Sequence, residues 1–173
     1  KFNESSKVKT LIEDLLKGKS IAVISDAGTP CISDPGFILV KEAIKNNIEV
    51  IGIPGPSAVT TAISISGFEA LSFVFYGFLP KEKKDIIKFL ESIKKDYSKV
   101  LVFYESPKRI IKSLEIIEDI FKSSSACVCN DLTKKFERIY RGSITEVIVD
   151  LKENENYEKG EYTIIIEKKE LKE

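Results

Sequence analysis

Two loops rich in glycine, proline and aspartate carry the residue types best suited to binding chemistry. The first covers residues 25–36 and contains Asp26 and Asp34 together with two rigid prolines; the second covers residues 54–58. Neither loop has the lysine of a phosphate-cradling loop or the spaced glycines of a dinucleotide fingerprint. Backbone amides, carboxylates and small side chains favour a ligand without phosphates, such as an adenosine that carries an amino-acid tail and a sulfonium.

The elements that must position these loops form a strand, helix, strand, helix series. Short apolar runs at residues 21–24 and 49–53 predict buried parallel strands. Helices are expected over residues 36–46, with Asp34 as the cap and Pro35 at the start, and over residues 59–66. A right-handed crossover would bring both loops to one edge of the sheet, where open α/β sheets bind ligands. The alternative is that both loops are ordinary structural turns.

The rest of the chain predicts an α/β fold in two parts, residues 1–69 and residues 70–173. A helix is expected before the first strand, and strands and helices then alternate. Their predicted ranges are helix 6–16, strand 71–76, helix 81–97, strand 99–104, helix 107–121, strand 126–129, strand 138–141, a Ser143-capped helix to 151 and strand 162–167. Two parallel strands make a poor sheet alone, so we expect that further strands precede them or come from another chain.

Composition excludes several function classes. Lys plus Arg equals Asp plus Glu at 27 each, so no global positive field draws the chain to nucleic acid and any RNA contact must be local. With no histidine there is no imidazole base or ligand, and we expect no metal site; Cys127 and Cys129 are interpreted as structural, on one face of a buried strand. The absence of an apolar run of membrane length or a signal peptide favours the cytoplasm, and the absence of methionine suggests a fragment or a processed chain.

Five segments together resemble, in order, the signature blocks of the ribosomal RNA small subunit methyltransferase I family, a branch of the tetrapyrrole methylase superfamily. They are SDAGTPCISDPG at 25–36, PGPSA at 54–58, YGFLP at 76–80, FYESPKR at 103–109 and LTK at 132–134. Porphyrin and corrin methylases usually carry Gly-Asp-Pro where this chain has Gly-Thr-Pro. The chain departs from the family at Asn130, where an arginine is usual, and in lacking the family's opening strand and the strand that follows it.

The resemblance implies two α/β domains of tetrapyrrole methylase type, with an N-terminal parallel sheet that is incomplete here and a C-terminal mixed sheet. It also implies a homodimer that transfers a methyl group from S-adenosylmethionine, bound between the domains, to the ribose 2′-oxygen of a cytidine in 16S ribosomal RNA. Carried over by position, the cofactor-binding residues are Asp26, Gly28, Thr29, Ile32, Ser33 and Asp34 from the first loop and Pro54, Gly55, Ser57 and Ala58 from the second.

A ribose hydroxyl is a weak nucleophile, so a group should take its proton. Without histidine, the candidates are Glu105 or Asp131, helped by Lys108 or Lys134, and we predict Glu105, Asp131 and Lys134 as the catalytic residues. Each could instead be a helix cap or an ion-pair partner. RNA contacts are predicted at Lys108, Arg109, Lys135, Arg138 and Arg141. The alternatives are a methylase of a tetrapyrrole or another small molecule, and an inactive cofactor- or RNA-binding fragment.

Overall fold

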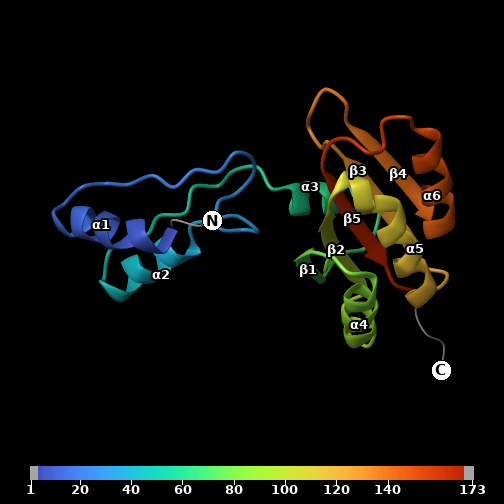
Figure 1. Cartoon of the computed structure of the whole chain (residues 1–173), viewed down its shortest axis with the longest axis horizontal. Helices are drawn as coiled ribbons and strands as arrows, with labels where there is room; N and C mark the ends of the chain where they lie inside the picture. Colours follow the sequence, from blue (N-terminus) through green and yellow to red (C-terminus); the bar gives the residue numbers. More distant parts are fainter. Residues whose placement is uncertain (1–3, 170–173) are drawn as a thin grey trace. The chain divides into compact units, whose positions relative to one another are not determined.

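The computed structural model describes residues 4–169, with side chains from residue 7 onward (Figure 1). The chain forms two compact units, Lys1–Ser57 and Ala58–Glu173. The domain boundary predicted at residues 69/70 stays a prediction. Within the described range, no helix is both long and apolar enough to span a lipid bilayer.

The first unit has a small core between two helices. Helix α1 (Glu4–Leu16) and helix α2 (Phe37–Lys45) confirm the two helices predicted there. They pack through Val8 and Ile12 of α1 against Leu39 and Ala43 of α2. The start of α2 differs from the prediction, because its N-cap is Gly36 and no side chain caps it. The predicted roles of Asp34 as cap and Pro35 as first helical residue are therefore wrong.

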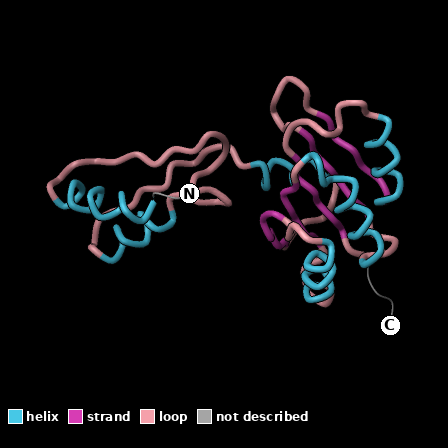
Figure 2. The backbone as a smooth tube through the Cα atoms, in the orientation of Figure 1, coloured by secondary structure: helices cyan, strands magenta, loops and turns pink. Residues whose placement is uncertain are grey.

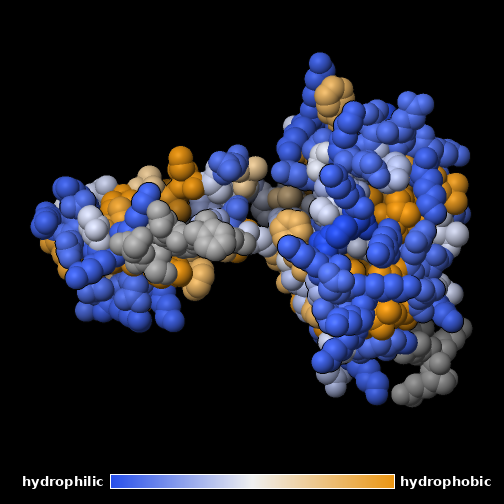
Figure 3. Space-filling view, in the orientation of Figure 1, coloured by the Kyte–Doolittle hydropathy of each residue, from blue (hydrophilic) through white to orange (hydrophobic). Residues whose placement is uncertain are grey.

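The two parallel strands predicted in the first unit do not form. Residues 21–24 and 49–53 lie in segments without regular structure, which Figure 2 draws as loop. Ile24, Ile51 and Ile53 are 87%, 70% and 80% exposed, and Figure 3 shows apolar side chains at the surface of this unit. A buried parallel strand needs hydrogen-bonding neighbours and cover on both faces. The described residues of this unit supply only two helices, so the strand prediction fails although the sequence pattern is strand-like.

The second unit is built on a five-stranded mixed sheet of order β1-β2-β5-β3-β4. Its strands are β1 (Phe73–Phe78), β2 (Val100–Glu105), β3 (Ser125–Asn130), β4 (Arg138–Ser143) and β5 (Tyr162–Glu167). β1 and β2 are parallel, and all other neighbours are antiparallel. The α/β class and the mixed sheet predicted for the C-terminal part are confirmed.

Helices cover both faces of this sheet. Its helices are α3 (Ala58–Ser66), α4 (Lys83–Ile93), α5 (Ile110–Ile120), preceded by the short 3-10 turn η1 (Pro107–Arg109), and α6 (Ile144–Glu153). The main core lies between the sheet and α4, α5 and α6. A smaller cluster beneath α3 includes Cys127 and Cys129, which are 0% and 1% exposed with their sulfurs 3.9 Å apart. The structural interpretation of this cysteine pair is confirmed.

Local sequence signals explain where these elements begin. Ser143 accepts a hydrogen bond from the backbone of Glu146, whose side chain returns to the backbone of Ser143. This capping box satisfies two amides at the start of α6, as the sequence predicts. Pro107 occupies the first position of η1, where its missing N–H costs nothing.

Candidate functional site

The two glycine- and proline-rich loops of the first unit meet. The hydroxyl of Thr29 donates a hydrogen bond of 3.0 Å to the carbonyl oxygen of Pro56. A Cβ atom added to Gly28 would lie 3.9 Å from the same oxygen. The expected convergence of these turns is thus present, although no strands carry them.

The first loop is held by its own contacts. The hydroxyl of Ser25 donates to the carbonyl oxygen of Gly28 at 2.9 Å, and Gly28, Cys31, Ser33 and Gly36 all have positive φ. At Gly36 a Cβ would lie 2.9 Å from the sulfur of Cys31 and could not fit without displacing it. Glycine is required there because φ is 126° as well.

This loop pair offers hydrogen-bond acceptors without cations. Asp26 is exposed and Asp34 is half-buried, and neither forms an ion pair with any residue the structure describes. Nine of the ten residues predicted to bind the cofactor lie on these loops, and Ala58 is the first residue of α3. Their role in cofactor binding stays a prediction.

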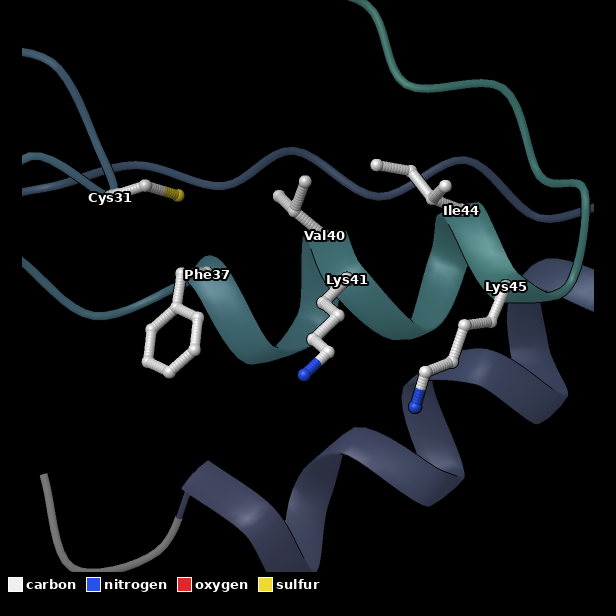
Figure 4. Close-up of a pocket in the computed structure, with 6 residues that line it drawn as sticks. All are labelled: Cys31, Phe37, Val40, Lys41, Ile44 and Lys45. Carbon is white, nitrogen blue, oxygen red and sulfur yellow. The ribbon is translucent and has the colours of Figure 1, made fainter.

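A shallow groove of about 380 Å³ runs along the outer face of α2 (Figure 4) and was not expected from the sequence. It is lined by Cys31, Phe37, Val40, Lys41, Ile44 and Lys45. In Figure 4 the amines of Lys41 and Lys45 extend to the same side of the helix as Phe37. The groove contains no carboxylate or hydroxyl, and its polar side chains are the thiol of Cys31 and the two lysine amines.

Three of the five signature segments meet at one edge of the sheet in the second unit. β1, β2 and β3 run in the same direction, so their carboxyl ends share this edge. The register pairs Glu105 with Tyr162, and Tyr162 in turn with Asn130. The segments 76–80 and 103–109, and the segment 132–134 that follows Asn130, therefore lie in one row, which we call the carboxyl edge.

Glu105, a predicted catalytic residue, is buried in this edge and fully occupied. Its side chain is 0% exposed. It accepts hydrogen bonds of 2.6 Å from the backbone N–H of Ser106 and from the hydroxyl of Ser113, and one carboxylate oxygen lies 2.6 Å from the Nη2 of Arg109.

Arg109, predicted to contact RNA, donates its hydrogen bonds to groups within the protein. Besides Glu105, it reaches the hydroxyl of Ser106 through Nε at 3.1 Å. Its terminal nitrogens donate to the carbonyl oxygens of Pro80 at 2.8 Å and Leu79 at 3.4 Å. Arg109 thus ties the loop after β1 to the turn after β2.

Asp131 and Lys134, the other two predicted catalytic residues, lie together after β3. A carboxylate oxygen of Asp131 accepts from the backbone N–H of Glu161 at 3.2 Å and lies 3.5 Å from Nζ of Lys134. Nζ of Lys134 also lies 2.7 Å from the carboxylate of Glu161. The hydrogen bond from Lys134 to Glu161 raises the pKa of Lys134 above its usual value, so this amine is a cation at neutral pH.

The remaining predicted RNA contacts divide into two groups. Lys108, Lys135 and Arg138 are exposed in or beside the carboxyl edge. Arg141 lies further along β4, opposite Cys127, and donates through Nε and Nη2 to the carbonyl oxygen of Ile65 at 3.1 and 2.7 Å. Arg141 therefore satisfies a carbonyl in the last turn of α3. The RNA-binding role of all five residues stays a prediction.

Sequence reasoning did not single out three residues that shape this edge. Ser113 donates to Glu105 from the otherwise apolar buried face of α5, and a lone serine in such a stripe was the available signal. At Gly160 a Cβ would come within 2.5 Å of the carboxylate of Asp131. Phe136 is 70% exposed beside the cations.

A comparison with known families identifies the fold. The family described as Tetrapyrrole (Corrin/Porphyrin) Methylases matches residues 2–148. The chain belongs to this family. Crystallised diphthine synthase, only 14% identical, shares the fold of this tetrapyrrole methylase with a TM-score of 0.71, over 98% of this chain and 68% of that one.

Curated relatives confirm the narrower resemblance inferred from the signature segments. The protein named "Ribosomal RNA small subunit methyltransferase I" of Buchnera aphidicola subsp. Schizaphis graminum is 44% identical over 99% of this chain. The protein of the same name from Thermotoga maritima is 38% identical over 97%. The chain spans 61% of the first relative's length and 74% of the second's. Within residues 4–169, no group of three or more metal-ligating side chains is placed to hold an ion.

Proposed function

We propose that this tetrapyrrole methylase acts in the S-adenosylmethionine-dependent methylation of 16S ribosomal RNA, at the ribose 2′-oxygen of a cytidine. The observation that carries the proposal is the 38–44% identity, over at least 97% of the chain, to relatives named for small-subunit rRNA methylation. The proposal includes the small ribosomal subunit as partner, a homodimer and a cytoplasmic location. A tetrapyrrole substrate is supported only by the fold and by the description of the broader family.

The loop pair of the first unit fits the proposed cofactor chemically. S-adenosylmethionine supplies a methyl group on a cationic sulfur and carries an amine and ribose hydroxyls, all of which favour acceptors. The carboxylates of Asp26 and Asp34 provide such acceptors, and the loops carry no lysine or arginine for a phosphate. The bond between Thr29 and Pro56 holds the two loops together, so part of the ordering cost of binding is already met.

The carboxyl edge of the second unit is proposed to position the ribose. Its predicted catalytic carboxylates differ in how accessible they are to a substrate. Glu105 has no exposed side-chain surface, whereas the side chain of Asp131 is 18% exposed beside the ammonium of Lys134. We therefore assign the proton-accepting role to Asp131, with Lys134 stabilising its charge. Holding the hydroxyl in near-attack geometry can lower the barrier by about 7–11 kcal/mol.

The test is transfer of tritiated methyl groups from S-adenosylmethionine to small ribosomal subunits, compared with free 16S rRNA and with a tetrapyrrole. Nuclease digestion followed by nucleoside analysis should place the label on the 2′-oxygen of a cytidine. Label on the tetrapyrrole alone would establish the small-molecule alternative. Cofactor binding without any transfer would establish the inactive binding module.

Two matched pairs of variants assign the roles within this assay. Asp26→Asn should weaken cofactor binding in calorimetry, while Glu13→Asn, a carboxylate on α1, should not. Asp131→Asn should lower kcat by about 10²-fold or more with little change in cofactor affinity. Asp150→Asn, a surface carboxylate on α6, is its control. Normal turnover by Asp131→Asn would remove Asp131 as the base.

A further inference from the structure

Phe136 lies in the connection between β3 and β4, which projects beyond the strands in Figure 1. Its side chain is 70% exposed. Single exposed apolar residues are common on proteins, so this exposure alone indicates nothing. What distinguishes Phe136 is the loop that carries it and the charges around it.

Hydrogen bonds within the loop define its backbone path. Its backbone makes two successive turns, in which the N–H of Lys134 donates to the carbonyl of Asp131 at 2.9 Å and the N–H of Glu137 donates to that of Lys134 at 3.1 Å. The carboxylate of Glu137 also accepts from the N–H of Thr133 at 2.6 Å. Phe136 occupies the third position of the second turn. These hydrogen bonds order the backbone that carries the exposed ring of Phe136.

Cations flank this ring. Nζ of Lys135 lies 5.5 Å from the centroid of the Phe136 ring, and Arg138, also exposed, is two residues further on. Neither cation forms an ion pair with the described residues. Lys134, by contrast, is neutralised by Glu161 and Asp131. Lys135 and Arg138 thus provide two cations free of ion pairs within the described range on either side of the exposed ring, while the carboxylate of Glu137, between them in the sequence, accepts from the backbone N–H of Thr133.

We propose that Phe136 is a stacking platform for an unpaired base of single-stranded RNA, with Lys135 and Arg138 contacting the adjacent phosphates. Every base has a face that stacks on an aromatic ring, and cations beside the ring neutralise the backbone. A protein partner would favour a wider apolar patch than one ring among lysines. This inference rests on the proposed function and deepens it, because it names residues that would bind the RNA substrate.

The sequence offers a sensitive probe, because the chain contains no tryptophan. Phe136→Trp places a single indole at the proposed platform, and stacking on a base should quench its emission. Tyr97→Trp is the matched control. Tyr97 is fully exposed in the connection before β2, and Lys95 and Lys99 each stand two residues from it in the sequence.

The experiment titrates both tryptophan variants with single-stranded RNA of about 12 nucleotides, within the length that stacking proteins cover. We expect strong quenching at position 136 and little at position 97. Equal quenching at both positions, or none at 136, would overturn the inference. Emission at 136 that changes with protein concentration in the absence of RNA would identify a second copy of the chain as the occupant instead.

Affinity provides an independent readout. Phe136→Ala and Phe136→Leu should both weaken RNA binding by about 5- to 150-fold, because each lacks an aromatic face. Phe136→Tyr should restore it, and the urea midpoint should stay unchanged in all three. If the parent chain methylates small subunits and Phe136→Ala does so with an unchanged KM, the platform is wrong and the proposed function stands. If the parent transfers no methyl group, the proposed function fails while the quenching titration still decides the platform.

Discussion

Replacing Glu105 by glutamine tests whether this residue is a brace or a base. The substitution keeps the shape of the side chain but removes its charge and places an amide N–H₂ among three donors: the N–H of Ser106, the hydroxyl of Ser113 and the guanidinium of Arg109. At least one of these donors then faces the amide N–H₂ of the glutamine instead of an acceptor. In the parent chain, the carboxylate of Glu105 can accept from all three donors at once.

The magnitude follows from burial. Removing one partner of a buried ion pair costs about 3–5 kcal/mol, because the other charge is left uncompensated. Here the side chain of Arg109 is 25% exposed and keeps its bonds to Pro80 and Leu79. We therefore expect Glu105→Gln to lower the free energy of unfolding by about 2–4 kcal/mol. Ser113→Ala should cost about 1–2 kcal/mol, because it removes a single bond to the carboxylate.

Tyrosine fluorescence during urea unfolding measures this loss selectively, because all six tyrosines lie in the second unit. Glu115→Gln is the control. Glu115 is also on α5, but its ion pair with Lys152 is about half exposed on both sides, so its loss should cost less than about 1 kcal/mol. If Glu105→Gln unfolds like the parent chain while methyl transfer falls by about 10²-fold or more, Glu105 is the base and the brace assignment is refuted.

Three further predictions concern the loops and helix ends. Thr29→Val removes the bond between the two loops of the first unit and should weaken S-adenosylmethionine binding about 2- to 12-fold in calorimetry; unchanged affinity would count against a shared site. Gly36→Ala should lower the free energy of unfolding by about 1–3 kcal/mol, measured by urea unfolding followed by circular dichroism, because φ is 126° there and the new Cβ would lie 2.9 Å from the sulfur of Cys31. Adding Cys31→Ala to the same chain should recover only the part of this loss that comes from the contact with Cys31. The hydroxyl and N–H of Ser143 lower the pKa of Glu146, so the Glu146 carboxylate stabilises the folded chain above its ordinary pKa of 4.5, and this stabilisation is lost as the pH falls below 4.5. The difference in the free energy of unfolding between the parent chain and Glu146→Gln should therefore shrink as the pH is lowered below 4.5. A difference that grows would contradict the capping box.

The sequence predicts correctly those helices and strands that pack against other elements of the same chain. The Ser143 capping signal, the cysteine strand and the alternation of strands and helices after residue 70 were read correctly, because each of these elements packs against another in the same unit. Residues 21–24 and 49–53 carry equally strong strand signals, yet Ile24 and Ile53 are exposed and no ladder forms. Pattern and propensity indicate what a segment can become, but neighbouring strands decide whether it does.

The candidate site shows a second limit of the sequence. A motif reveals which residues gather at the end of a strand, and the glutamate and arginine of the segment 103–109 could equally be a base with an RNA contact or an internal brace. Only coordinates distinguish these roles, because the difference is whether the donors of Arg109 point outward or toward Pro80 and Glu105. With both residues facing inward, the predicted RNA contacts that remain exposed at the carboxyl edge are Lys108, Lys135 and Arg138. The structure thus moves the search for RNA contacts from the turn after β2 toward the loop after β3, where an exposed aromatic ring accompanies the cations.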